Sequence, residues 1–178
     1  MAASEESKDY VHLLTKQIAD AAQGSPETMV RNIADFERNY AAYDIPATLQ
    51  EAIDFNADLI IVAIGENVGQ LKTEDEQTVF SESVKNLLTE IRSNNNPTIL
   101  VRSTFWSDTS KNVALQKACS ATGVHYVDLG RLDADEANFA RSERQIEHAG
   151  VAGHPGDQGM RAIADALWIA VKRISANP

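Results

Sequence analysis

The sequence predicts an α/β fold in which helices cover both faces of a parallel sheet. Apolar runs alternate along the chain with stretches whose apolar residues recur at helical spacing. The run Leu59–Ile64 ends at Gly65 and is typical of a parallel strand buried on both faces. With 178 residues, 43% of them hydrophobic, the chain suits one compact core, so we expect a single domain over residues 1–178.

Helical spacing and stop signals define the elements before this run. Apolar residues recur at helical spacing after Tyr10 and stop before Gly24, which predicts a helix over residues 8–22. Pro46 suits the first turn of a later helix, where its missing N–H leaves no helical bond unmade. The other elements expected here are a short strand over residues 28–33 and helices over residues 35–43 and 46–55.

Capping and stop signals also define the elements that follow. Thr73 and Glu76 form a capping-box pattern that starts a helix with one apolar side. This helix should end at the run Asn94–Asn96, directly before Pro97. The remaining elements expected before residue 130 are a strand over residues 98–101, a helix over residues 108–121 and a strand over residues 124–129.

Residues 130–157 show no clear periodicity of apolar residues. A segment of this length in a compact domain is usually functional or partly helical, and here it leads directly to His154. Asp157 is expected to be the N-cap of the final helix, because aspartate is favoured at that position. The residues that this helix should direct inward are Met160, Ile163, Ala164, Leu167, Val171 and Ile174.

Charge and composition exclude several classes of partner. The chain carries 26 acidic and 16 basic residues, a net charge of −10, which would repel nucleic acid and an anionic membrane surface. It contains no apolar run near the roughly 20 residues that span a bilayer, and its start lacks the order of a signal peptide. We therefore expect no nucleic-acid or membrane partner, and the sequence indicates no particular compartment.

Metal and nucleotide chemistry are not expected. The single cysteine, Cys119, lies in a helical pattern that favours a small buried residue. Phosphate-loop and dinucleotide fingerprints are missing, so a nucleotide-binding or phosphoacceptor-receiver function is the weaker interpretation and no cofactor is predicted. Four histidines fall on separate elements without ligand spacing, which predicts no metal site: His12, His125, His148 and His154.

The residues after each predicted strand are the candidates for a ligand site, because open parallel sheets bind ligands beyond the carboxyl ends of their strands. Gly65 permits a tight turn, after which Asn67 would present an amide donor able to stabilise an oxyanion. The alternative is that Asn67 simply caps a turn. The segments at this edge are residues 32–35, 65–67, 102–104 and 129–131.

His154 is the candidate general base. It lies between glycines, beside a predicted helix start, at the end of a long loop. An imidazole in that place can accept a proton near neutral pH. The alternative is an ordinary loop histidine.

Two of these motifs resemble sequence blocks of the SGNH (GDSL-type) hydrolases, and they occur in the same order and with similar spacing. Residues 64–67 are similar to the third sequence block of that family, and residues 154–160 to the fifth. The resemblance implies a flavodoxin-like three-layer α/β/α sandwich and lipase-like ester hydrolysis through a serine. It implies that His154 is the general base and Asn67 an oxyanion-hole donor. The second block, where the family has a glycine, falls near Asn32, which makes Asn32 a second candidate for the oxyanion hole. Residues 36–40 and 104–106 resemble members with carbohydrate-ester substrates.

The chain departs from this family at the nucleophile. The first block, a strand ending in Gly-Asp-Ser, is absent, so we expect a truncated form that lacks the central first strand. The loss should expose an unpaired sheet edge, which a homo-oligomer or a strand-swapped dimer would cover. Ser4 is the candidate for a replacement nucleophile within the chain, whereas Ser103 is expected to hydrogen-bond locally.

A second departure is Val151, at the position where the family has the aspartate that orients the histidine. Glu147, Asp157 or a backbone carbonyl could hold the ring instead, and the carbonyl ranks first. The sequence therefore predicts an SGNH-type serine esterase for short-chain, acetyl-like esters, with carbohydrate esters as candidate substrates and its nucleophile segment missing. The alternative is an inactive module of the same fold that binds a carbohydrate or acyl ligand.

Overall fold

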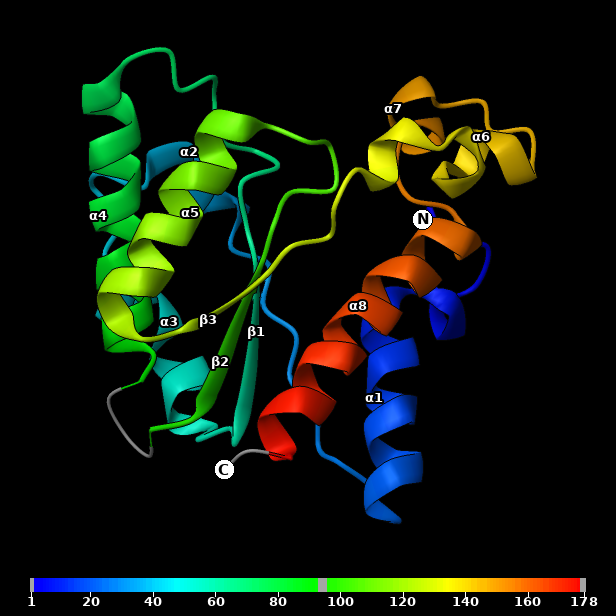
Figure 1. The fold of residues 1–178 in the computed structure, drawn as a ribbon, viewed down its shortest axis with the longest axis horizontal. Coiled ribbons are helices and arrows are strands. Elements are labelled where there is room, and N and C mark those ends of the chain that lie inside the picture. Colours follow the sequence, from blue (N-terminus) through cyan, green and yellow to red (C-terminus); the bar gives the residue numbers. More distant parts are fainter. Residues whose placement is uncertain (1, 93–95, 177–178) are drawn as a thin grey trace. The chain divides into compact units, whose positions relative to one another are not determined.

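The computed structural model describes residues 2–92 and 96–176 and shows a mixed α/β fold with a three-stranded parallel sheet (Figure 1). Backbone proximity divides the chain into two compact units. Unit 1 consists of Met1–Thr28 and Leu129–Pro178, and unit 2 consists of Met29–Asp128. Unit 1 therefore combines both ends of the chain, whereas unit 2 is continuous and holds the whole sheet.

The sheet of unit 2 has the order β1-β2-β3 and confirms the last three predicted strands. These strands are β1 (Leu59–Ala63), β2 (Thr98–Arg102) and β3 (His125–Val127). All pairs are parallel, so Ile61 lies opposite Leu100 and Leu100 opposite His125. The helices of this unit are α2 (Ala34–Asn39), α3 (Ile45–Asp54), α4 (Glu74–Glu90) and α5 (Thr109–Thr122).

Local caps confirm the predicted start of α4. The Glu76 backbone N–H donates to the Thr73 hydroxyl at 3.2 Å, and the Glu76 carboxylate accepts from the Thr73 N–H at 2.9 Å. Backbone N–H donors, that of Thr73 first and that of Lys72 second, lower the pKa of Glu76 below its ordinary value. The helix ends at Glu90, and Asn94 and Asn95 of the predicted stop lie outside the described residues.

The strands of the sheet differ in burial. Ile99, Leu100 and Val101 of β2 are buried, as is Arg102 at its end. In β1 only Val62 is buried, although all five of its residues are apolar. The prediction that the first apolar run forms a strand is confirmed, but its expected burial on both faces is wrong, because β1 pairs with β2 alone among the described residues.

The predicted strand over residues 28–33 is wrong. These residues belong to no strand, and Val30 is 69% exposed. The side-chain oxygen of Asn32 accepts from the Ala34 N–H at 2.9 Å, which turns the chain into α2. A strand needs a neighbour to complete its ladder, and among the described residues none pairs with this segment.

Unit 1 is built around two long helices, α1 (Tyr10–Ala22) and α8 (Asp157–Ser175), which pack together. The Gln17 side-chain amide of α1 donates to the Asp165 carboxylate of α8 at 2.7 Å. Residues 130–157 are partly helical, as expected. The short helices of this unit are η1 (Glu6–Lys8), η2 (Leu132–Ala134), η3 (Glu136–Asn138), α6 (Ala140–Glu143) and α7 (Ala149–Ala152).

The prediction that Asp157 caps α8 is wrong. Helix α8 begins at Asp157 itself, and the capping position is Gly156. The N–H groups of Asp157 and Gln158 both donate to the Glu143 carboxylate, each at 2.7 Å. A carboxylate from a distant part of the chain therefore supplies the acceptor that the local sequence was expected to supply, and it also complements the positive end of the helix.

Candidate functional site

The turn after β1 is held in a conformation that requires glycine. Gly65 has φ +114°, a value that side-chain-bearing residues rarely adopt. A Cβ atom at this position would lie 2.6 Å from the Thr104 Cγ2 atom of the neighbouring turn. The turn then exposes Asn67 at the carboxyl end of β1, the edge where parallel sheets bind ligands.

A buried carboxylate braces this turn. Glu37 of α2 is 5% exposed, and its Oε1 atom accepts the N–H of Gly65 at 2.7 Å and that of Asn67 at 3.0 Å. Its Oε2 atom accepts the Asn67 side-chain Nδ2 at 2.7 Å. Sequence reasoning missed Glu37 as a functional residue. The available signal was its spacing, because it shares a helical face with Ile33 and Tyr40, both apolar.

A second carboxylate joins the turns after β1 and β2. The Glu66 Oε1 atom accepts the Phe105 N–H at 2.7 Å and the Arg102 Nη1 at 3.0 Å. Arg102 is buried and also donates from Nη1 to the Ser103 carbonyl at 2.7 Å. Ser103 is itself fully buried. The carboxyl edge of the sheet is therefore a rigid platform, in which two turns are joined by ion pairing and backbone hydrogen bonds.

His154 lies in unit 1, in the turn between α7 and α8. Its Nδ1 atom is 2.5 Å from the Gly150 carbonyl oxygen, which only accepts, so Nδ1 donates and the neutral form of the ring has its lone pair on Nε2. A backbone carbonyl therefore holds the ring, as ranked first from the sequence. The Ala140 N–H donates to the His154 carbonyl at 2.9 Å and fixes the backbone of this turn.

Ser4 lies in the same unit and anchors the start of the chain to α8. Its hydroxyl donates to Asp157 Oδ2 at 2.6 Å and accepts from Lys8 Nζ at 2.9 Å, while its backbone N–H donates to Asp157 Oδ1 at 2.7 Å. Lys8 and Asp157 also form an ion pair at 3.0 Å. Burial raises the pKa of Asp157, but the hydrogen bonds from Ser4 and the Lys8 contact outweigh it and lower the pKa to about 2.

The predicted site residues therefore fall into two groups. Asn67 and Asn32 belong to unit 2, together with Glu37, whereas His154 and Ser4 belong to unit 1. Asn32 uses its side-chain oxygen to accept from the Ala34 N–H, and its role as an oxyanion donor remains a prediction. The catalytic roles of His154, Asn67 and Ser4 remain predictions as well.

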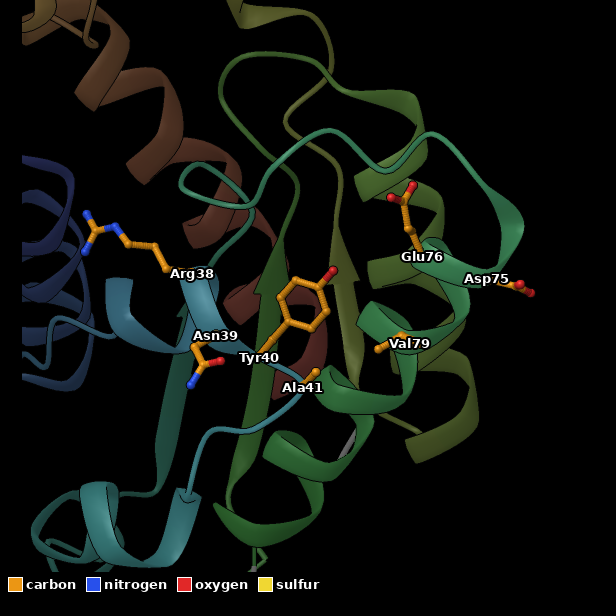
Figure 2. Close-up of a pocket in the computed structure, with 7 residues that line it drawn as sticks. All are labelled: Arg38, Asn39, Tyr40, Ala41, Asp75, Glu76 and Val79. Atoms are coloured by element: carbon orange, nitrogen blue, oxygen red, sulfur yellow. The ribbon is translucent and has the colours of Figure 1, made fainter.

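An open hollow of about 360 Å³ lies between α2 and the start of α4 (Figure 2). The Tyr40 ring forms one side of it and packs edge-on against Phe80, with ring centroids 5.1 Å apart. Aromatic, amide and carboxylate groups together can hold a polar ligand. The residues that line the hollow are Arg38, Asn39, Tyr40, Ala41, Asp75, Glu76 and Val79.

Comparisons of the chain with protein-family models, with curated proteins and with solved structures found no match. In residues 2–92 and 96–176, no three His, Cys, Asp or Glu side chains are grouped as ligands for a metal ion. Over the same residues, no helix has the length and apolar character needed to cross a membrane. The site is therefore interpreted from its own geometry.

Proposed function

We propose that this chain is an SGNH-type serine esterase domain that acts on short-chain, acetyl-like esters, with carbohydrate esters as its substrate class. The observation that supports this most strongly is the His154 ring, whose Nδ1 donates to the Gly150 carbonyl, the tautomer that has its basic lone pair on Nε2 in the neutral ring. A general base needs that tautomer to take a proton from a hydroxyl.

The mechanism assigns one step to each group. A serine hydroxyl attacks the ester carbonyl while His154 Nε2 accepts its proton, and the Asn67 amide donates to the oxyanion that forms. His154 then returns the proton to the leaving alcohol, and water releases the acyl group by the same steps. Because a neutral carbonyl replaces the usual aspartate, the proposal is a Ser-His dyad with a less stabilised imidazolium.

The proposal also extends the sheet. In a flavodoxin-like three-layer α/β/α sandwich, a further parallel strand would pair with β1 and bring the serine to the carboxyl edge. The half-buried state of β1, despite five apolar residues in succession, supports this extension. Under this proposal the strand and its serine would lie outside residues 1–178, because a second copy of these residues has the same sequence.

The hollow beside Tyr40 supports a carbohydrate substrate. Its lining combines the Tyr40 ring with the polar residues Arg38, Asn39, Asp75 and Glu76. Such groups can order sugar hydroxyls, which both donate and accept hydrogen bonds. The hollow lies on α2, the helix that also carries Glu37.

The alternative function is a binding module without catalysis, which holds a carbohydrate or acyl ligand. The geometry of Ser4 favours it, because that hydroxyl donates to Asp157, whose pKa of about 2 makes it a poor general base. Under this alternative, Asn67 and the hollow would bind the ligand and no ester bond would break.

The test is hydrolysis of an aryl acetate, followed by the butyrate, by four proteins: residues 1–178, Ser4→Ala, His154→Ala, and a longer chain that includes any codons translated before Met1. The esterase proposal expects turnover by the longer chain alone, and its loss by about 10²–10⁴-fold when His154 is replaced there. A longer chain that binds acylated sugars without turnover would establish the binding module instead.

A further inference from the structure

We propose that Glu37 is a positioning residue that sets which way the Asn67 carboxamide faces. The Asn67 NH₂ group is turned toward the Glu37 carboxylate, so its second N–H is left as a donor at the turn after β1. The benefit for catalysis rests on the proposed role of Asn67 as an oxyanion donor. The contact itself does not depend on that role.

The chemistry of the three hydrogen bonds supports this assignment. An ionised carboxylate only accepts, and Glu37 accepts three N–H groups, two on Oε1 and one on Oε2. If the Asn67 carboxamide turned over, its oxygen would face Oε2 and two acceptors would meet at hydrogen-bond distance. Because Glu37 is 5% exposed, water cannot easily relieve that repulsion.

The position of Glu37 distinguishes positioning from direct catalysis. Its negative charge would oppose an oxyanion nearby, so the side chain cannot act by stabilising that charge. Three N–H donors instead neutralise part of the carboxylate charge and tie it to the backbone of the turn at Gly65 and Asn67. Glu37 therefore acts through Asn67 and is not itself a catalytic residue.

Glu37→Gln provides a sharp test, because glutamine has nearly the same size as glutamate and replaces one accepting oxygen of the carboxylate with a donating NH₂ group. The oxygen of the introduced glutamine should face the backbone N–H groups of Gly65 and Asn67, because its NH₂ group would be repelled by these two donors. Its NH₂ group would then face Asn67, and the Asn67 carboxamide would turn over to accept. Glu37→Gln should thus exchange a donor for an acceptor at the candidate oxyanion site while the turn persists.

The experiment is nuclear magnetic resonance of the side-chain amides in ¹⁵N-labelled residues 1–178, with the Asn67 signals assigned by their loss in Asn67→Ser. In the parent chain, one Asn67 amide proton should exchange roughly tenfold or more slowly than those of the exposed Asn39, as expected for a hydrogen bond to a charged group. Glu37→Gln should abolish this protection. Glu143→Gln, which alters a carboxylate that also accepts two backbone N–H groups, should preserve it. Equal exchange of Asn67 and Asn39 in the parent chain would overturn the proposal.

A second measurement starts in the parent background, so its first comparison holds even if Glu37→Gln folds poorly. Asn67→Asp sets a carboxylate against Glu37 and should lower the melting temperature, whereas Asn39→Asp should change it little. In the Glu37→Gln background the Asn67→Asp penalty should disappear, because the introduced glutamine amide can donate to the introduced carboxylate. In the parent background, an Asn67→Asp penalty no larger than that of Asn39→Asp would contradict the contact. Where Glu37→Gln folds, a penalty of the same size in both backgrounds would contradict it as well.

These readouts need no turnover and are therefore separate from the esterase test. If the amide signature is found but no form of the protein hydrolyses esters, the proposed function fails while the positioning role stands. If an active form is obtained, Glu37→Gln should lower kcat by about 10²–10³-fold, as for loss of an oxyanion donor, and change KM by less than about threefold. Activity that survives Glu37→Gln unchanged would overturn the catalytic benefit of the positioning, while the amide signature decides the positioning itself.

Discussion

The two turns that carry the candidate catalytic groups are both braced by a carboxylate, but in different ways. Glu37 accepts two backbone N–H groups in the turn after β1, and Glu143 accepts two at the start of α8. Glu37 is buried and also holds the Asn67 side chain, whereas the Glu143 side chain is 23% exposed and contacts backbone only at this turn. The same hydrogen-bond pattern should therefore contribute more to stability and site geometry where water is excluded.

Glu37→Ala is the strongest test of this comparison. The substitution leaves the N–H groups of Gly65 and Asn67 without their acceptor, and Gly65 is buried. We expect the free energy of unfolding to fall by about 2–4 kcal/mol, because an unsatisfied buried donor costs about 1–3 kcal/mol. Urea unfolding followed by circular dichroism measures this loss. A loss below that of Glu143→Ala would contradict the comparison.

The two glycines of these turns allow a matched test. Gly65→Ala should lower the free energy of unfolding by about 2–3 kcal/mol, because it combines a positive φ with a Cβ contact of 2.6 Å. Gly156→Ala should cost about 1 kcal/mol or less, since its 2.7 Å neighbour is the movable end of the Glu143 side chain. Gly65→Ala should therefore lower the melting temperature more than Gly156→Ala does. The reverse order would show that the turn before α8 is the more rigid one.

Glu143→Ala should have a smaller effect than Glu37→Ala. It removes the acceptor for two N–H groups in the first turn of α8, which water can replace in part. The expected cost is about 1 kcal/mol, similar to the loss of a helix cap. Urea unfolding measures it, and Glu136→Ala serves as the control, because that exposed carboxylate pairs with Arg141 on the surface. Equal costs would contradict the bracing role of Glu143.

The smallest expected effect is the acid sensitivity of unit 1. The pKa of Asp157 is about 2 in the folded chain, below its ordinary value of 3.8. Its contacts therefore stabilise the fold above about pH 4 and are lost as the pH falls toward about 2. Ser4→Ala should reduce this part of the pH dependence, measured as melting temperature between pH 5 and about pH 2. An unchanged profile would show that Ser4 does not anchor Asp157.

Much of the local structure follows from local signals. The Thr73–Glu76 capping box, the Asp108 cap of α5 and the turn at Gly65 depend on residues a few positions apart, and all three are present. The carbonyl that holds His154 is also local, since Gly150 lies one helical turn before it. These features need no knowledge of the remaining chain, because backbone geometry and short-range hydrogen bonds determine them.

Tertiary structure decided the remaining features. Residues 28–33 have the composition of a strand but lack a neighbour, and Asp157 has the character of a cap but is bound to Ser4 and Lys8 while Glu143 takes its place. Glu37 acquires its role only when α2 meets the turn after β1, 28 residues further along the chain. Whether a strand pairs and whether a carboxylate is buried both depend on which distant groups meet and on whether water reaches them. A local sequence pattern contains no information on either point.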